Sequence, residues 1–189
     1  IGGTIPIKAD RTHVYASSLI FNEHGQRMGH FDKIHLFDVT LADGQEQYRE
    51  SDSILAGSKK AVVVDSPFGK IGLTVCYDLR FPELYRELVA QGAQILTVPA
   101  AFTAATGAAH WEILLRARAI ENLCYVIAPN QGGRHASGRE TYGDSMLINP
   151  WGQVLDRVAT GPGVALAEID LAQLERTREH FPCLDHRRL

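Results

Sequence analysis

Cys76 is the residue whose position best suits covalent chemistry. It follows the β-branched run 70–75 and stands a few residues before the predicted helix 82–91. In open α/β sheets, ligands and reactive groups gather at the carboxyl ends of strands. The positive end of a following helix and nearby cations are expected to lower the pKa of a thiol there, and the thiolate is the attacking species. The position of Cys76 is also compatible with the alternative of a buried, unreactive cysteine.

The other cysteines and the known sequence motifs indicate no second reactive centre. Cys124 begins a predicted strand and Cys183 lies near the C-terminal end, so both are more typical of small apolar side chains used in packing. Three widely spaced cysteines fit neither a disulfide framework nor a zinc knuckle. No C-x-x-C, H-E-x-x-H, G-x-G-x-x-G or G-x-x-x-x-G-K-[ST] pattern occurs. We therefore predict neither a metal nor an organic cofactor.

Composition limits the class of protein. The 189 residues are 45% hydrophobic, which predicts one domain with a real core. The 19 Lys and Arg against 22 Asp and Glu give a net charge of -3 without like-charge blocks, which argues against nucleic-acid and membrane partners. No apolar run approaches a membrane span, no secretory signal follows Ile1, and the cysteine count favours a reducing compartment. We therefore expect a soluble, cytoplasmic protein.

The N-terminal part predicts strands and one long connection. Alternating segments at 4–8, 13–21 and 26–33 predict three strands, and the turn 22–25 predicts a hairpin between the last two. Periodicity fails over 34–59, and a connection of that length is uncommon unless it is functional. Because it contains histidine, aspartate and glutamate, we expect it to form a wall of the site.

The remaining segments predict strands that alternate with helices. The predicted elements are a hairpin of 61–64 and 70–75, a helix 82–91, a strand 94–99, a helix 111–122, a strand 124–128, a Gly-rich loop 130–143, segments 145–149, 153–158 and 164–170, and a helix 171–181. Strands that alternate with helices between terminal hairpins predict an α/β fold, with a mixed sheet covered by helices.

Several segments resemble one known family. Gly72-Leu-Thr-Val-Cys76-Tyr-Asp-Leu-Arg-Phe-Pro-Glu83 closely resembles the nucleophile motif of the nitrilase, or carbon-nitrogen hydrolase, superfamily, and Asp32-Lys33-Ile-His-Leu-Phe-Asp38 resembles its lysine motif. Further matches are the segments 110–122, 142–152 and 186–188. The resemblance covers nearly the whole chain in the right order. It implies that residues 1–189 form one carbon-nitrogen hydrolase domain with an α-β-β-α sandwich of mixed sheets.

The resemblance also implies catalytic roles. Cys76 matches the nucleophile, Lys33 the catalytic cation, and Glu50 the second of the family's two glutamates. Lys33 can favour the thiolate and then stabilise the oxyanion formed on an amide carbonyl, with the backbone N–H of Tyr77 as a second donor. Glu50 would hold the lysine charged and oriented.

One catalytic group of the family has no match. The first glutamate, the general base, lies upstream of the lysine motif in a segment that this sequence does not contain, and Glu23, in a predicted turn, is the only earlier glutamate. The sequence therefore resembles a family member without its N-terminal strands and helices. A non-catalytic remnant is one alternative function. Another is a Cys/His peptidase or thioesterase, with His110 or His135 as the base.

The residues of these motifs resemble those of one branch of the superfamily. This branch hydrolyses amides of small keto acids and contains deaminated-glutathione amidase and ω-amidase. This resemblance implies hydrolysis of the amide bond of a small carboxylate-bearing amide through a cysteine thioester, with release of ammonia and without a cofactor. A small-molecule amide is therefore the expected partner. A homodimer is also implied by the resemblance.

Three residues are candidates for binding such a substrate. Arg80 is the candidate for the carboxylate, because a guanidinium suits bidentate binding, and its alternative is an ion pair with Asp78 or Glu83. Phe102 and Thr106 match positions that line the acyl pocket in the branch, although Phe102 equally suits the core.

Overall fold

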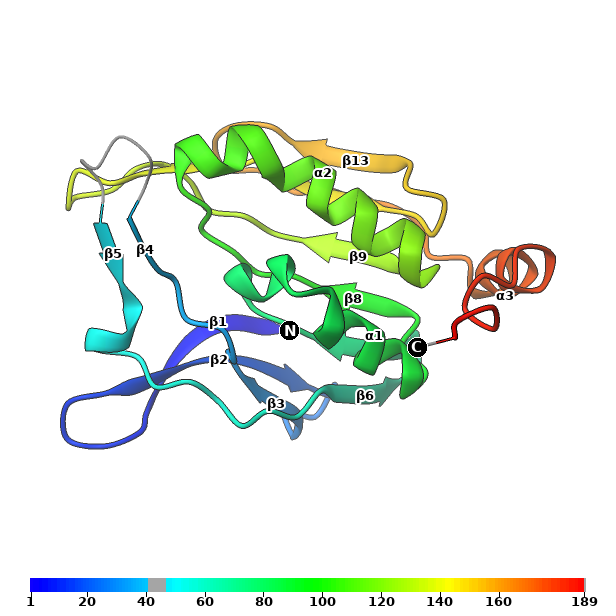
Figure 1. Ribbon diagram of the computed structural model, residues 1–189, viewed down its shortest axis with the longest axis horizontal. Coiled ribbons are helices and arrows are strands. Elements are labelled where there is room, and N and C mark those ends of the chain that lie inside the picture. The colour runs from blue at the N-terminus through cyan, green and yellow to red at the C-terminus, as the bar shows by residue number, and fades with distance from the viewer. Residues whose placement is uncertain (41–46, 189) are drawn as a thin grey trace.

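A six-stranded mixed sheet forms the centre of the computed structural model, which describes residues 1–40 and 47–188 (Figure 1). The strand order is β13-β12-β9-β8-β7-β6, in which β7, β8 and β9 are parallel and the other neighbours antiparallel. The strands are β6 Val62–Ser66, β7 Gly69–Leu73, β8 Ile95–Thr97, β9 Tyr125–Ala128, β12 Ser145–Ile148 and β13 Val154–Val158. The predicted α/β class with a mixed sheet is confirmed.

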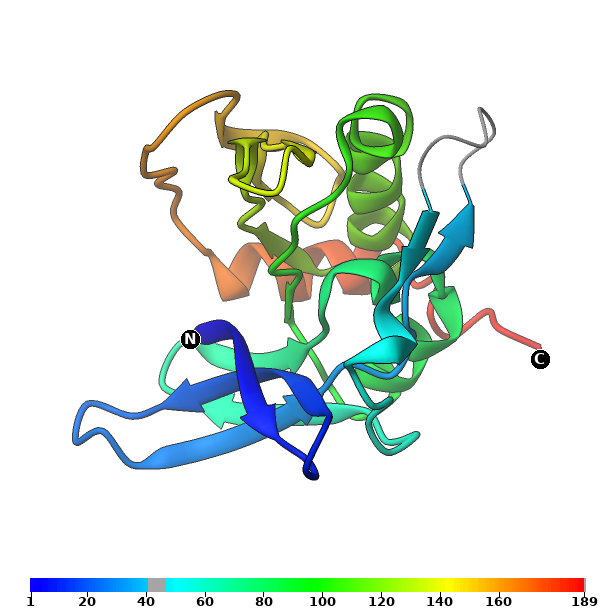
Figure 2. The ribbon, with the colours of Figure 1, turned by 90° about the vertical axis from the view of Figure 1, so that its left-hand side faces the viewer.

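A second, antiparallel sheet lies beside the β6 end of the larger one (Figures 1 and 2). It consists of β1 Gly2–Lys8, β2 Val14–Phe21 and β3 Arg27–Asp32, so the three predicted strands are confirmed. The sheets approach closely at Gly29, where an added Cβ would lie 2.4 Å from the Val64 side chain. A larger residue there would push the two sheets apart.

Helices α1 (Pro82–Ala90) and α2 (Ala104–Asn122) cover one face of the larger sheet (Figure 1). They bury Tyr85 and Trp111 completely against it. Helix α3 (Leu171–His180) packs beside the starts of β8 and β9, where Arg178 donates hydrogen bonds to the carbonyls of Ala93 and Leu123. The two parallel crossovers formed by α1 and α2 place their strand ends on one side, where the site lies.

Two predicted loops contain short paired strands. The connection 34–59 contains β4 (Asp38–Thr40), β5 (Gln47–Arg49) and the 3-10 helix η1 (Glu50–Asp52), while residues 41–46 of that predicted loop lie outside the described residues. The Gly-rich loop contains the hairpin of β10 (Gly132–Arg134) and β11 (Glu140–Tyr142). The interpretation of these two segments as loops without strands was wrong, because three-residue strands are specified by their partners and not by local periodicity.

Two further boundaries differ from the predictions. Helix α2 begins at Ala104, seven residues before the predicted start at 111, because Thr103 caps it by accepting a hydrogen bond from the Thr106 N–H at 3.3 Å. The Ala-rich first turns have no apolar periodicity that would reveal them. The segment 164–170 joins neither sheet, and the side chains of Val164 and Leu166 are exposed.

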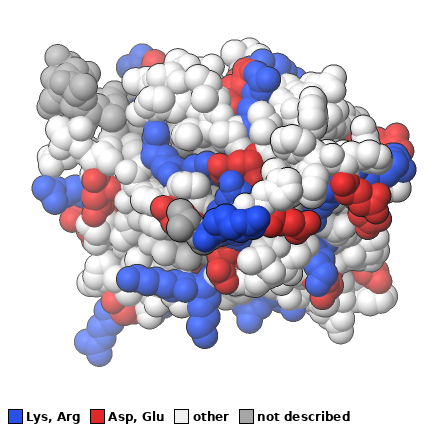
Figure 3. All heavy atoms as spheres, turned by 45° about the vertical axis from the view of Figure 1, so that its right-hand side comes forward, with Lys and Arg blue, Asp and Glu red and all other residues white. Residues whose placement is uncertain are grey.

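Charges of both signs are interspersed on the face shown in Figure 3, without a broad single-sign patch. Within residues 1–40 and 47–188, no helix combines the length and the hydropathy needed to cross a membrane.

Candidate active site

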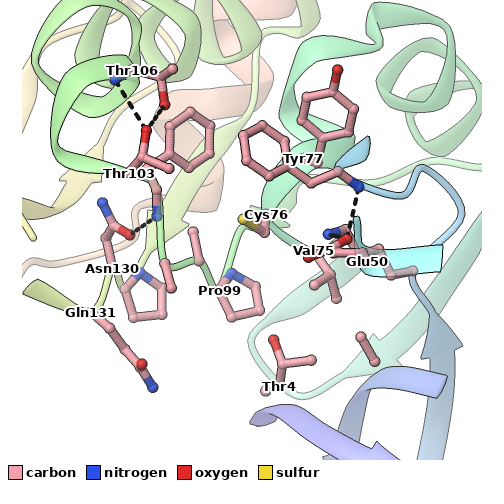
Figure 4. A pocket seen from close by; sticks show the side chains of 18 of the residues that line it. Thr4, Glu50, Val75, Cys76, Tyr77, Pro99, Thr103, Thr106, Asn130 and Gln131 are labelled. Atoms are coloured by element: carbon pink, nitrogen blue, oxygen red, sulfur yellow. Dashed lines mark hydrogen bonds and ion pairs between the residues drawn. The ribbon is translucent and has the colours of Figure 1, made fainter. Parts of the chain in front are cut away.

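A cavity of about 510 Å³ opens where β7, β8 and β9 end. Its wall includes residues that follow each of these strands, together with parts of the connection 34–59, as predicted for a site wall. Figure 4 shows the Cys76 sulfur facing into it, with Glu50 on one side and Thr103 and Thr106 on the other. All seven residues predicted for the site line this cavity: Lys33, Glu50, Cys76, Tyr77, Arg80, Phe102 and Thr106.

The backbone at Cys76 turns sharply from the sheet into a short helix. Its N–H donates to the Pro99 carbonyl at 2.9 Å, and its φ of +50° lies in the left-handed region that non-glycine residues rarely adopt. The 3-10 helix η2 (Cys76–Arg80) starts at this residue. Tyr77 is therefore in the first turn, where backbone N–H groups have no partner within the helix, which suits an oxyanion donor.

The buried Asp78 ties this turn to the lysine segment. Its carboxylate accepts hydrogen bonds from the Val75 N–H at 3.0 Å, the His35 N–H at 3.0 Å and the His35 ring Nδ1 at 2.7 Å. The His35 ring in turn stacks on Phe81 at 3.6 Å. Among the described residues, the partners of the Asp78 carboxylate are Val75 and His35 and not Arg80, so the alternative in which Asp78 pairs with Arg80 was wrong.

The end of η2 is held by a second buried group. The guanidinium of Arg118 donates to the Leu79 carbonyl from Nε at 3.0 Å and from Nη2 at 2.8 Å, and it lies 5.2 Å from the centre of the Tyr85 ring. The Tyr85 hydroxyl bonds to Thr74, two residues before Cys76, at 2.9 Å. The nucleophile turn is therefore fixed at both ends by buried polar contacts.

Lys33 and Glu50 form an ion pair at the wall of the cavity. Lys33 is only 1% exposed, and its Nζ contacts Glu50 Oε2, which also accepts the Phe37 N–H at 2.8 Å. The Lys33 backbone is fixed by Gly57, whose N–H donates to its carbonyl at 2.8 Å. A buried lysine needs such a partner to stay charged. Glu50 is the only carboxylate among the described residues that line the cavity.

Burial raises the pKa of the Cys76 thiol above its ordinary value of 9.0. The charge of Lys33, the backbone N–H of Ala101 and the charge of Arg139 offset this rise only in part. The expectation of a lowered thiol pKa was therefore wrong, because loss of water outweighs the nearby cation. Cys76 is consequently a neutral thiol at pH 7 and needs a base to become the nucleophile.

This shift predicts the pH dependence of alkylation. Because the raised pKa lies above 9, the iodoacetamide rate at Cys76 should rise about tenfold per pH unit from pH 7 to 9 without a plateau. Lys33→Met should slow the reaction at each pH by raising the pKa further. Peptide mapping separates Cys76 from the partly exposed Cys183 and from Cys124, whose burial raises its pKa to about 11. A plateau below pH 8 would contradict this assignment.

Arg80 enters the cavity without a carboxylate partner. Its guanidinium carbon lies 5.8 Å from the centre of the Tyr77 ring and 5.4 Å from that of Phe102. Within the described residues it forms no ion pair, so the alternative pair with Glu83 was also wrong. A guanidinium that has no carboxylate partner and lies near two aromatic rings has the chemistry to bind an anion.

Phe102 and Thr106 form the wall beyond Arg80. Phe102 is 4% exposed and packs on Trp111 at 4.8 Å, so it belongs both to the core and to the cavity. The Thr106 hydroxyl bonds to that of Thr103 at 2.7 Å. This pair therefore holds the start of α2 at the cavity edge.

The sequence predictions missed several polar residues of the cavity, among them Asn130 and Arg139. Asn130 is 7% exposed, accepts the Phe102 N–H at 3.1 Å and thereby fixes the loop after β8. Arg139 donates to the Ala101 carbonyl at 2.7 Å and lies over the Tyr48 ring. Both follow Pro129 in a segment with little periodicity, so only their closeness to Cys76 in space reveals them.

No histidine of the described residues lines the cavity. His135 bonds to Thr141 at 2.7 Å, and His110 contacts Arg80. The Cys/His alternative therefore lacks a base beside Cys76 in the part of the chain that the structure describes. In that same part, no group of three or more His, Cys, Asp or Glu side chains is arranged to hold a metal ion.

A cysteine at a strand end beside a buried lysine and glutamate, on a mixed α/β fold, is the arrangement that the resemblance implies for a carbon-nitrogen hydrolase. The chain belongs to this family, whose sequence profile, described as carbon-nitrogen hydrolase, matches residues 1–179. The predicted superfamily and enzyme class are thereby confirmed.

Named relatives and a solved structure agree with this assignment. A deaminated glutathione amidase of Synechocystis sp. is 48% identical over 98% of this chain and 68% of its own length. The protein of that name from Bos taurus is 49% identical over 93% of this chain and 53% of its own length. The crystal structure of the Caenorhabditis elegans NitFhit protein superposes with a TM-score of 0.88 at 44% identity, over 94% of this chain and 43% of that one. The chain thus spans about half to two thirds of the length of these curated relatives.

Proposed function

We propose that this protein hydrolyses the C–N bond of a small amide that carries a carboxylate, through a thioester on Cys76. One observation carries the proposal: Cys76, the Lys33–Glu50 pair and the unpaired guanidinium of Arg80 line a single cavity. A nucleophile, an oxyanion partner and an anion site are three of the groups that such a reaction uses, and a base is the fourth.

The reaction has two halves. In the first, the Cys76 thiol gives its proton to a base, and the sulfur attacks the amide carbonyl carbon. The C–N bond then breaks, and the nitrogen leaves with a proton, as ammonia from a primary amide or as an amine from an N-substituted one. In the second half, a water molecule gives a proton to the base and attacks the thioester, which releases the carboxylic acid and restores the thiol.

The base in this scheme is the family's first glutamate. By the resemblance it lies upstream of the lysine motif, in a segment that residues 1–189 do not contain. Glu50 is less suited to that role, because its Oε2 already accepts from Lys33 and from the Phe37 N–H. Glu50 instead keeps Lys33 charged and directed at the reacting oxygen.

The negative charge of the tetrahedral intermediate falls between two donors. Lys33 lies in the cavity wall with Cys76, and the Tyr77 N–H is free within the first turn of η2. A charged donor in a site shielded from water stabilises the oxyanion far more than it would in bulk water. In this proposal, Lys33 stabilises the transition states of both halves of the reaction.

The opposite wall of the cavity supports the proposed substrate class. Arg80 supplies a two-pronged donor for a carboxylate, and Phe102 and Thr106 bound the space for a short acyl chain. The names of the two curated relatives support an amide related to deaminated glutathione. A short ω-amide with a carboxylate at its other end also fits this wall.

A matched pair of amides tests the proposal. Arg80→Ala should raise KM for glutaramate roughly 10- to 100-fold, because a charge-assisted hydrogen-bond pair is lost. It should raise KM for pentanamide, which has the same chain length without the carboxylate, far less. Steady-state assays of ammonia release measure both, with the exposed Arg11→Ala as the charge-matched control. Equal effects on the two amides would place the carboxylate elsewhere, and no release from any ω-amide would remove the proposed activity.

A further inference from the structure

His110 is the one described polar partner of the Arg80 guanidinium. Its ring Nδ1 lies 3.3 Å from Nη1 and 3.3 Å from Nη2 of Arg80. His110 lies on α2, seven residues after the Thr103 cap, while Arg80 ends η2. The contact therefore joins two elements at the rim of the cavity.

The donor and acceptor roles in this contact are fixed by chemistry. A guanidinium has only N–H donors and stays protonated in proteins, so the histidine nitrogen that it meets must accept. The lone pair of His110 Nδ1 is therefore the acceptor in this contact. A neutral acceptor orients the guanidinium without cancelling its charge, whereas a carboxylate in the same place would occupy it.

We propose that His110 is a positioning residue, which holds Arg80 so that its guanidinium receives the carboxylate of the substrate. This inference rests on the proposed function. The rings of Tyr77 and Phe102 flank the same guanidinium at 5.8 and 5.4 Å from its carbon, and they limit its movement across the cavity. His110 limits its movement out of the cavity. The long arginine side chain is then ordered before the substrate arrives, which lowers the entropy cost of binding.

This role differs from that of a catalytic base. His110 does not line the cavity, and its side chain is exposed on α2. It acts through Arg80 alone. Its loss should therefore affect the binding of carboxylates much more than the chemical step, and it should leave the core intact.

The kinetic test compares three variants on the two matched amides. His110→Ala should raise KM for glutaramate about 3- to 10-fold, the usual penalty for ordering one long side chain, with a much smaller change in kcat. His110→Asn should restore most of the affinity, because its Oδ1 accepts at nearly the place of the histidine Nδ1. Ile113→Ala, at an exposed position of the same helix, is the control and should leave both constants unchanged.

A double variant tests the route through Arg80. Adding His110→Ala to Arg80→Ala should cause no further rise in KM, because the group that His110 positions is already absent. Additive effects overturn the inference. So does an Asn variant that behaves like the Ala variant, or a pentanamide KM that rises as much as that for glutaramate.

A binding measurement separates this inference from the proposed activity. Glutarate should protect Cys76 from iodoacetamide, and the concentration for half protection should rise about 3- to 10-fold in His110→Ala and recover in His110→Asn. If this pattern holds while no amide is hydrolysed, the positioning role stands and the amidase proposal fails. If glutarate protects the His110→Ala variant as well as the wild type, or protects neither, the positioning role is wrong even where amide hydrolysis is observed.

Discussion

Replacing Cys76 with alanine is expected to reduce kcat for amide hydrolysis by at least about 10⁴-fold, the size of loss seen when a covalent nucleophile is removed. The reason is geometric as well as chemical. Cys76 contributes the only sulfur in the described cavity wall, and its left-handed backbone turns that sulfur toward the substrate space. Release of ammonia from glutaramate measures the effect.

The matched control for this variant is Cys183→Ala, which removes a partly exposed thiol outside the cavity. It should keep full activity. Circular dichroism and the melting temperature of both variants should stay close to those of the wild type, because a thiol and a methyl group differ little in size. Substantial turnover by a folded Cys76→Ala protein would contradict the role given to this residue.

Replacing Lys33 with methionine is expected to lower kcat/KM roughly 10³-fold, because a charged oxyanion donor is lost from a buried position. Methionine keeps most of the length and packing of the lysine stem. The same change removes the cation that lowers the pKa of Cys76, so alkylation of the thiol should slow in parallel. Steady-state kinetics and iodoacetamide labelling measure these two effects.

The control must separate catalysis from stability, because Lys33→Met leaves the Glu50 carboxylate without its partner. Loss of one member of a buried ion pair costs about 3 kcal/mol. Adding Glu50→Gln removes the uncompensated charge, and the double variant should regain stability in urea unfolding while activity stays low. Recovery of activity together with stability would show that Lys33 acts only in folding.

The sequence motifs predicted which residues form this site, but they did not predict the environment of the Cys76 thiol. The strand end at Cys76 and the lysine segment around Lys33 were both recognisable, and the structure brings them into one cavity with Glu50. What the sequence misjudged was the sign of the thiol pKa shift. That sign depends on how completely the thiol is removed from water, a property of packing between distant segments that residue order does not reveal.

The fold, too, was predicted only in part. Long alternating segments predicted β1, β2 and β3, whereas the short pairs β4–β5 and β10–β11 escaped prediction because each three-residue strand is specified by its antiparallel partner and not by its own periodicity. The roles of Asp78 and His110 were missed for a related reason. Each acts through a contact 30 or more residues away in the chain, to His35 and Arg80 respectively.

Trapping the covalent intermediate tests the central claim most directly. The protein is mixed with glutaramate, quenched in acid during steady-state turnover, digested and analysed by mass spectrometry. The account predicts that the peptide containing Cys76 gains the mass of the acyl group, that hydroxylamine removes it, and that Cys76→Ala shows no adduct. Turnover with an acyl group on another residue, or with none on Cys76 under conditions where the thioester accumulates, would contradict the account.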